Sequence, residues 1–286
     1  MHPQDGTRVG PAIEVRGLVR RFGARTAVDG LDLELQRGQA LGLLGPNGAG
    51  KTTTIRILST LCAPSAGSVR VLGLDPQREA AALRARIGVV PQELALYDAL
   101  RARENLAFYG RMHGLAGARL ERRVDWALEL AGLRERAQDL VRTYSGGMKR
   151  RLNLVAALLH EPELVFMDEP TVGVDPQSRN HVFEMVERLH AEGLTLVYST
   201  HQLGEVERLC DRIVILDAGR SVAQGTLAEL QRGQGTAAKA YARVELDGEV
   251  RARLERAGVA FRVEEELPNL EAVFLALTGR ALRDEE

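Results

Sequence analysis

The chain has 286 residues, 45% of them hydrophobic and 27% charged, a composition typical of one large globular domain or of a core domain with a small appendage. Its 38 lysines and arginines nearly balance its 39 aspartates and glutamates, and they are scattered, so nothing favours a nucleic-acid partner. The apolar runs are far shorter than the roughly 20 residues of a membrane-spanning helix, and the first residues lack the apolar core of a signal peptide, which predicts a cytoplasmic chain.

The amino-terminal segment predicts antiparallel strands. Ile13 and Val15 alternate with polar residues, and Leu31, Leu33 and Leu35 do the same in LDLELQRG. A period of two indicates strands with one polar face. The next stretch, ALGLLG, is apolar on both faces, which predicts a buried central strand. It ends at a glycine-rich turn, after which AGKTTTIRILSTL has helical spacing.

Further along the chain, four apolar segments predict buried strands. They are RIGVV, ELVFMDEP, LTLVYSTH and DRIVILDAG, and helical patterns such as NHVFEMVERLHAEG and LGEVERLC occur among them. Strands that alternate with helices predict a parallel α/β sheet. Between about residues 93 and 160 the pattern is almost entirely helical, which predicts a helical subdomain inserted into the α/β core.

The carboxy-terminal part of the chain predicts a separate module. LAELQRGQGT, residues 227–236, indicates a short helix that runs into a linker. Beyond it, AYARVEL, EVRARLERAG, AFRVEEEL and NLEAVFLALTGR indicate strand, helix, strand and helix. We therefore expect a main domain over residues 1–233 and a small α+β module over residues 236–286, which either supports assembly or is inert.

Two cysteines, Cys62 and Cys210, match no metal or redox spacing. Each lies in an apolar context, so both are expected to be buried thiols. Without a disulfide framework, nothing indicates an oxidising compartment.

A glycine-rich loop follows the predicted central strand and fits the phosphate-loop pattern G-x-x-x-x-G-K-[ST]. Its glycines let backbone N–H groups converge on phosphate oxygens, and the positive end of the next helix favours the same anion. Lys51 is expected to reach the β- and γ-phosphates of ATP, and the Thr52 hydroxyl to bind Mg²⁺. The predicted ATP-binding residues here are Gly45, Pro46, Asn47, Gly48, Ala49, Gly50, Lys51, Thr52 and Thr53.

The strand LVFMDE ends in two carboxylates, which complements the phosphate loop. Phosphate-loop enzymes hold Mg²⁺ with a carboxylate at such a strand end, so Asp168 is the expected metal ligand. Glu169 could then act as the general base that polarises the attacking water. A strand ending in Asp-Glu is common by itself, and only the pairing with the phosphate loop gives it this meaning.

A serine and two glycines, Ser145, Gly146 and Gly147, precede the helical run from Met148 to Leu159. Backbone N–H groups at a helix start can bind an anion. Serine is also a common helix N-cap, so the segment alone indicates either a cap or a second phosphate site.

In this order, the motifs make residues 12–230 resemble the ATP-binding-cassette family. The resemblance implies a phosphate-loop NTPase core with an antiparallel β edge subdomain and a helical subdomain. It implies that Phe22 stacks on adenine, where most members have tyrosine. It also implies that Gln92 senses Mg²⁺, the attacking water and the membrane partner, and that His201 contacts the γ-phosphate. By itself, a histidine at a strand end is more often structural.

The segment 144–148, YSGGM, resembles the family signature LSGGQ but departs at both ends. Tyr144 is a mild change, whereas Met148 removes a side-chain hydrogen-bonding group and leaves the backbone donors. The resemblance implies that Asp175 couples the two ATP sites of a dimer. The residues expected to contact the ATP of a partner subunit are Ser145, Gly146, Gly147 and Met148.

The same resemblance implies an assembly. In this family each ATP lies between the phosphate loop of one subunit and the signature of another, and this chain has one of each. It is therefore expected to form a head-to-tail dimer, with itself or with a homologous ATPase subunit. A separate transmembrane permease would contact Gln92 and the stretch from Leu94 to Phe108, and would hold the chain at the cytoplasmic face of the cell membrane.

Three stretches, GVDP, ELALY and LEAVFLALTGR, look like the drug-resistance branch of bacterial exporters. They imply export of drugs or other lipophilic compounds. The alternatives are an importer of the same cassette type, or an exporter of polysaccharide, haem or sodium. Non-transport members with long coiled coils or with two cassettes fit less well, because this chain has no sustained heptads and one cassette.

Overall fold

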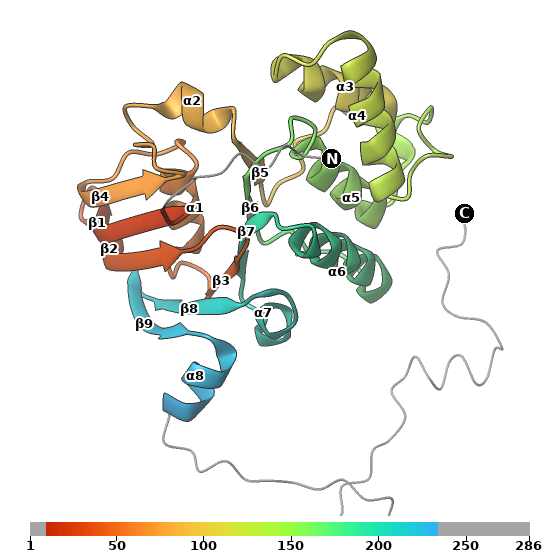
Figure 1. Ribbon diagram of the computed structural model, residues 1–286. Coiled ribbons are helices and arrows are strands. Elements are labelled where there is room, and N and C mark those ends of the chain that lie inside the picture. The colour runs from red at the N-terminus through yellow and green to blue at the C-terminus, as the bar shows by residue number, and fades with distance from the viewer. Residues whose placement is uncertain (1–9, 234–286) are drawn as a thin grey trace, which may run out of the picture. The chain divides into compact units, whose positions relative to one another are not determined.

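Two β-sheets organise the part of the chain that the computed structural model describes, residues 10–233 (Figure 1). One sheet has three strands and the other has six. The module expected over residues 236–286 lies outside the described residues.

The three-stranded sheet is antiparallel. Its central strand β1 (Ile13–Phe22) pairs with β2 (Arg25–Leu35) on one side and with β4 (Ala66–Val71) on the other. The inward-facing apolar residues of β1 and β2 are buried and alternate with exposed polar ones, as the period of two predicts. The strand β4 was not predicted, because only two of its six residues are buried.

The six-stranded sheet is parallel except at one edge, which confirms the predicted α/β core. Its parallel strands are β5 (Ile87–Val90), β6 (Leu164–Asp168), β7 (Thr195–Thr200), β3 (Ala40–Leu44) and β8 (Arg212–Asp217). The edge strand β9 (Arg220–Gly225) pairs antiparallel with β8, and the full order is β5-β6-β7-β3-β8-β9. Every residue of β6 and β7 is buried, as expected for strands covered on both faces.

The helices fall into two groups (Figure 1). Those beside the sheets are α1 (Lys51–Leu58), α2 (Ala80–Arg84), α6 (Pro176–Ala191), α7 (Leu203–Leu209) and α8 (Leu227–Gly233). The others gather away from the three-stranded sheet and form the expected helical subdomain, with α3 (Ala102–Met112), α4 (Gly117–Leu130), a 3-10 turn (Val141–Thr143) and α5 (Gly146–Ala156). Within residues 10–233, no helix combines the length and apolar character that a bilayer crossing requires.

The six-stranded sheet lies between two hydrophobic cores. Because successive side chains of a strand point to opposite faces, β6 supplies both cores. Val165 and Met167 join the core under the helical subdomain and α6. Leu164 and Phe166 join the core under the three-stranded sheet and α1. The end of β6, where the two carboxylates lie, is therefore anchored from both sides.

Both cysteine residues are half-buried, whereas their apolar contexts predict full burial. Cys62 lies at the edge of one core and Cys210 at the edge of the other. A Cβ on Gly42 would lie 3.1 Å from the Cys210 sulfur, so the thiol itself is tightly covered. Burial raises the pKa of the Cys210 thiol to about 12, which keeps it protonated and unreactive.

Candidate functional site

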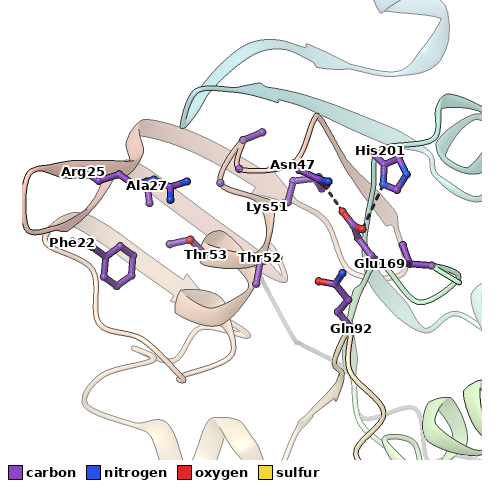
Figure 2. A pocket seen from close by; sticks show the side chains of 14 residues that line it. Phe22, Arg25, Ala27, Asn47, Lys51, Thr52, Thr53, Gln92, Glu169 and His201 are labelled. Carbon is purple, nitrogen blue, oxygen red and sulfur yellow. Dashed lines mark ion pairs between the residues drawn. The ribbon is translucent and has the colours of Figure 1, made fainter.

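A cavity of about 530 Å³ opens where the two sheets meet, and it collects predicted site residues from distant parts of the chain (Figure 2). Phe22 comes from the end of β1, Gln92 from the loop after β5, Glu169 from the end of β6 and His201 from the end of β7. From the predicted phosphate loop and the start of α1, the lining residues are Asn47, Gly48, Ala49, Gly50, Lys51, Thr52 and Thr53. Arg25, Ala27 and Val172, which sequence reasoning did not identify, complete the lining.

The phosphate loop is pressed between two strands, which explains two of its glycines. A Cβ on Gly45 would lie 2.2 Å from the Leu216 carbonyl oxygen, and one on Gly50 would lie 2.6 Å from the Ala27 carbonyl oxygen. Gly50 also has a φ of 105°, which disfavours other residues. It precedes α1, whose first turn has no acidic residue and whose N-cap forms no side-chain hydrogen bond. The first amide groups of α1 are thus available to an anion.

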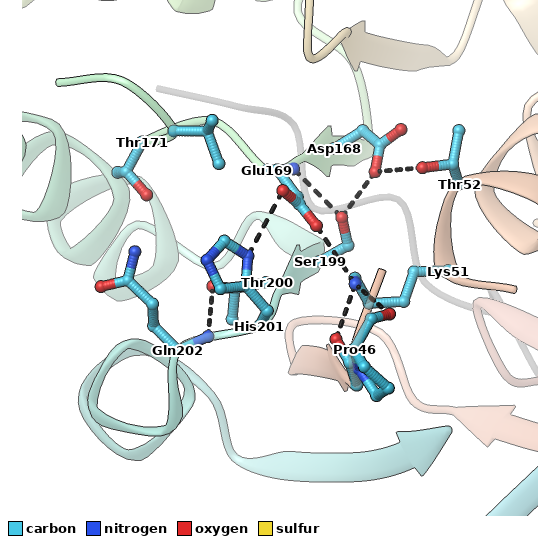
Figure 3. Close-up of polar contacts among 12 residues, drawn as sticks. Pro46, Lys51, Thr52, Asp168, Glu169, Thr171, Ser199, Thr200, His201 and Gln202 are labelled. Carbon is cyan, nitrogen blue, oxygen red and sulfur yellow. Dashed lines mark hydrogen bonds and ion pairs between the residues drawn. The ribbon is translucent and has the colours of Figure 1, made fainter. Parts of the chain in front are cut away.

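Lys51 is almost fully buried, and its ammonium lies among three oxygen atoms (Figure 3). The Nζ atom donates hydrogen bonds to the carbonyl oxygens of Gly45, at 2.7 Å, and Pro46, at 3.1 Å. It also forms an ion pair with Glu169 Oε1 at 3.1 Å. An ammonium has three donors, so each donor meets one oxygen. The ammonium is thereby held beside the Glu169 carboxylate, and both residues line the cavity.

Thr52 and Asp168 present oxygen atoms to each other across the junction of α1 and β6. The Thr52 hydroxyl donates to Asp168 Oδ1 at 3.1 Å. A hydroxyl and a carboxylate are ligands that suit Mg²⁺, which keeps much of its coordination shell for phosphates and water. Within the described residues no group of three acidic, histidine or cysteine side chains could cage a metal.

Ser199 links the two carboxylate residues and was missed by sequence reasoning. Its hydroxyl donates to Asp168 Oδ1 at 2.6 Å and accepts from the Glu169 backbone N–H at 3.0 Å (Figure 3). The residue is fully buried and lies directly opposite Asp168 in the pairing of β6 with β7. The only sequence signal was its place two residues before His201 at the end of an apolar strand.

Glu169 occupies a strained backbone position. Its φ is 46°, a left-handed conformation that costs a residue with a side chain on the order of 1–2 kcal/mol. This turn directs the nearly buried carboxylate into the cavity. One oxygen pairs with Lys51, and the other lies 3.4 Å from Nδ1 of His201. The carboxylate therefore stands between the phosphate-loop lysine and the strand-end histidine.

The far end of the cavity is aromatic and open. Phe22 is 46% exposed, and the Arg20 guanidinium lies 4.3 Å from the centre of its ring. Figure 2 shows the ring on the opposite side of the phosphate loop from Glu169 and His201. An exposed ring in this place offers a flat apolar surface to a second ring.

The signature segment lies outside this cavity and forms the start of α5. The Ser145 hydroxyl accepts a hydrogen bond from the Met148 backbone N–H at 3.3 Å, so the serine is an N-cap in this chain. The half-buried Met148 packs against the core of the helical subdomain. A Cβ on Gly147 would lie 2.0 Å from the Ser178 hydroxyl oxygen, whereas the space around Gly146 is open.

Asp175 also lies outside the cavity, at the start of α6. Its carboxylate accepts a hydrogen bond from the Ser178 backbone N–H at 2.9 Å and so caps the helix. This backbone hydrogen bond holds the pKa of Asp175 below its usual range. Asp175 and the signature are close neighbours, because Ser178 contacts both segments.

A buried polar cluster beneath the segment after Glu169 was also missed. The Thr171 hydroxyl donates to Glu205 Oε1 at 2.7 Å, and the Tyr198 hydroxyl donates to Glu205 Oε2 at 3.2 Å. Burial raises the pKa of Tyr198, which keeps its hydroxyl a donor. A glutamate on the apolar face of α7 was the available sequence signal.

Comparison with known proteins identifies similar chains. The family model described as ABC transporter matches residues 28–172. The linearmycin resistance ATP-binding protein LnrL of Bacillus subtilis is 41% identical, and the match covers 95% of this chain and 100% of that protein. The daunorubicin resistance ATP-binding protein DrrA3 of Streptomyces coeruleorubidus is 48% identical, with 78% of this chain and 71% of that protein covered.

The fold is similar to that of solved structures as well. One of them, described as the ATP binding subunit of an ABC transporter, superposes with a TM-score of 0.72 at 32% sequence identity. The match covers 80% of this chain and 95% of that structure. The similarity thus extends over almost the whole of the solved subunit.

Proposed function

Since the chain belongs to the ABC transporter family, as an ATP-binding and ATP-hydrolysing subunit, we propose that it powers export of a drug or another lipophilic compound through a separate permease. The observation that carries this proposal is the similarity to LnrL, which spans the full length of that linearmycin resistance protein. Similarity to the daunorubicin resistance protein DrrA3 supports the same class of cargo.

ATP binding follows from the cavity. Phe22 would stack on adenine, and the amide groups of the phosphate loop and of α1 would bind the phosphates. Lys51 would exchange its partner Glu169 for the β- and γ-phosphate oxygens, because phosphate carries more charge and reaches the same donors. Thr52, Asp168 and Gln92 would hold Mg²⁺, which neutralises phosphate charge when bound.

Hydrolysis would begin with the carboxylate that Lys51 releases. Glu169 would accept a proton from the attacking water, since its backbone turn already directs it into the cavity. His201 lies beside the same carboxylate and would contact the γ-phosphate. In this scheme ATP itself switches Glu169 from ion-pair partner to base.

The signature would complete the site of a second subunit. Ser145, Gly146, Gly147 and Met148 lie outside the cavity of their own chain. Apart from the Met148 N–H, which the Ser145 hydroxyl caps, the first amide groups of a helix have no acceptor within that helix and suit a phosphate. A head-to-tail dimer, with itself or a homologous subunit, would place them over the partner's ATP, with Asp175 beside them.

The permease would dock on an exposed apolar patch that we define as Leu94, Tyr97 and Phe108. These residues are 40%, 48% and 36% exposed, and the rings of Tyr97 and Phe108 meet edge to face with centres 4.9 Å apart. The patch follows Gln92 in the chain, so a partner there would lie next to a residue of the ATP cavity. Docking would hold the chain peripherally at the cytoplasmic face of the membrane.

A transport assay with the permease tests this function. Cells that express both proteins should accumulate less of a lipophilic fluorescent drug, and Glu169→Gln should abolish the effect. Tyr97→Asp should also abolish export while the purified chain keeps its ATPase activity, because a charge in the patch blocks docking without reaching the cavity. ATP-dependent uptake of the drug, or unchanged export by Tyr97→Asp, would contradict the proposal.

A further inference from the structure

The helix that begins with the signature also holds the segment after β5. Three of its side chains, which we call the α5 clamp, contact that segment at successive points. In the clamp, Arg150 donates to the Gln92 carbonyl oxygen at 2.7 Å, Asn153 Oδ1 accepts from the Ala95 backbone N–H at 3.1 Å, and Lys149 Nζ lies 2.8 Å from Asp98 Oδ1. The segment that carries Gln92 is therefore fixed to α5 along its length.

Arg150 makes a second contact that joins another loop of the cavity. Its other terminal nitrogen donates to the Val172 carbonyl oxygen at 3.0 Å. Gln92 and Val172 both line the cavity, although they are far apart in the sequence: Gln92 follows β5 and Val172 follows β6. One guanidinium on the signature helix thus bridges the backbones of two loops that contribute residues to the cavity.

The chemistry of this contact requires arginine. Arg150 is 7% exposed, and the two partners described above are both backbone carbonyl oxygens. Burial lowers its pKa, and backbone carbonyls take the place of a carboxylate as acceptors of its charged donors. A planar fork can reach two carbonyls at once, whereas a lysine ammonium concentrates its donors at one point.

We propose that Arg150 is a positioning residue for ATP hydrolysis, which acts by holding Gln92 in register with the signature helix. The inference rests on the proposed function of the cavity. When ATP closes a dimer on Ser145, the movement of α5 passes through Arg150 to the Gln92 backbone. Gln92 then reaches Mg²⁺ and water only when the signature is engaged. Without Arg150, ATP still binds, but Gln92 is no longer placed for the reaction.

The experiment is a double-mutant cycle on the full chain, with Arg150→Met, Gln92→Ala and the double variant. Steady-state ATPase assays give kcat and KM, and a fluorescent ATP analogue gives Kd. Arg150→Met should lower kcat about tenfold and leave Kd within about twofold, since it removes positioning and not binding. In the Gln92→Ala background, the same substitution should lower kcat by less than about threefold.

The matched control is Arg123→Met. Arg123 also lies in the helical subdomain, and burial lowers its pKa too. It donates to the carbonyl oxygens of Leu158 and Leu159, both at 2.9 Å, and does not line the cavity. If Arg150 only stabilised the fold, both methionine variants would lower the melting temperature and neither would change kcat selectively.

The outcomes are distinct. Equal loss of kcat from Arg150→Met in both Gln92 backgrounds, or equal kcat in the Arg150 and Arg123 variants, would overturn the inference. Should Arg150→Met fail to fold, Arg150→Lys provides the same cycle with a smaller perturbation. Failure of the chemistry proposed for the cavity would show differently, as a wild-type chain that hydrolyses ATP no faster than Glu169→Gln.

Discussion

At the scale of single residues, the cavity contains a buried pair of opposite charges. Lys51 and Glu169 are 4% and 8% exposed at their side chains and are paired at 3.1 Å. Removing one partner of a buried pair leaves an uncompensated charge, which destabilises proteins by about 3–5 kcal/mol. Variants at Lys51 therefore affect both binding and stability, and the two effects need separate measurement.

Lys51→Ala and Lys51→Arg should each weaken ATP binding by at least tenfold, since a charge-assisted hydrogen bond contributes about 1.5–3 kcal/mol. Arginine should fail because its planar fork does not fit where one ammonium meets three oxygens. Titration with a fluorescent ATP analogue measures the affinity. The double variant Lys51→Ala with Glu169→Gln should recover thermal stability without recovering affinity. Wild-type affinity in Lys51→Arg would refute the assigned role.

Motif and order could predict from the sequence which residues lie together, whereas their chemical roles stay a prediction. Phe22, Gln92, Glu169 and His201 all line one cavity together with the phosphate loop. Ser199 and Arg150 could not be predicted, since their partners are set by strand register and by helix packing. A serine in an apolar strand, or one of two adjacent arginines in a helix, has no distinguishing local pattern.

At the scale of elements, the strands that could be predicted from the sequence are those that bury the most apolar side chains. The strands β3, β6, β7 and β8 were predicted because long apolar runs mark strands covered on both faces. The edge strand β9 has mostly exposed or half-buried residues, and α2 has one buried residue among five. Such short elements depend on their neighbours, so the local sequence carries little signal for them.

One contact between elements predicts a pH dependence of stability. His113, which follows α3, stacks on His160, which follows α5, with ring centres 3.7 Å apart. His160 Nε2 lies 2.9 Å from the Ile87 carbonyl oxygen and donates to it, so Nδ1 is the unprotonated nitrogen. Burial, together with His113, lowers the pKa of His160 to about 4. Arg123 also faces the pair and opposes further positive charge.

A histidine whose pKa is lowered by folding binds protons more readily in the unfolded chain. Its contribution to stability is therefore complete above pH 6.5 and is lost as the pH falls toward 4. His160→Gln should make the free energy of unfolding less dependent on pH in this range, because it removes the titrating group. Urea unfolding at pH 7.5 and pH 5 measures the effect, expected to be on the order of 1–2 kcal/mol. An equal loss of stability in wild type and variant would contradict this origin.

At the scale of the whole molecule, the proposed dimer predicts that ATP promotes association of two subunits. Glu169→Gln should bind ATP and hydrolyse it slowly, because an amide cannot accept the proton from water. ATP would persist between the subunits, so size-exclusion chromatography should show a dimer fraction that rises with ATP concentration. Adding Gly146→Glu should reverse this by repulsion from the γ-phosphate.

The position of that second substitution follows from the structure. The space around Gly146 is open, whereas a side chain on Gly147 would collide with Ser178 of the same chain. Loss of the dimer in a Gly147 variant could thus arise inside one subunit. A Gly146→Glu double variant that still dimerises with ATP would rule out the shared site.

The strand order bears on how the protein is made in the cell. The central strand β3 leaves the ribosome early, but its neighbours β7 and β8 are translated only after residue 194. At ordinary elongation rates this delay is on the order of ten seconds, during which β3 has neither partner. The phosphate loop follows β3 directly and lies against Leu216 of β8, so its shape depends on late-made residues. The phosphate loop of a nascent chain is therefore expected to reach its final conformation only after β8 has been translated. A product truncated before β8 would then not hydrolyse ATP.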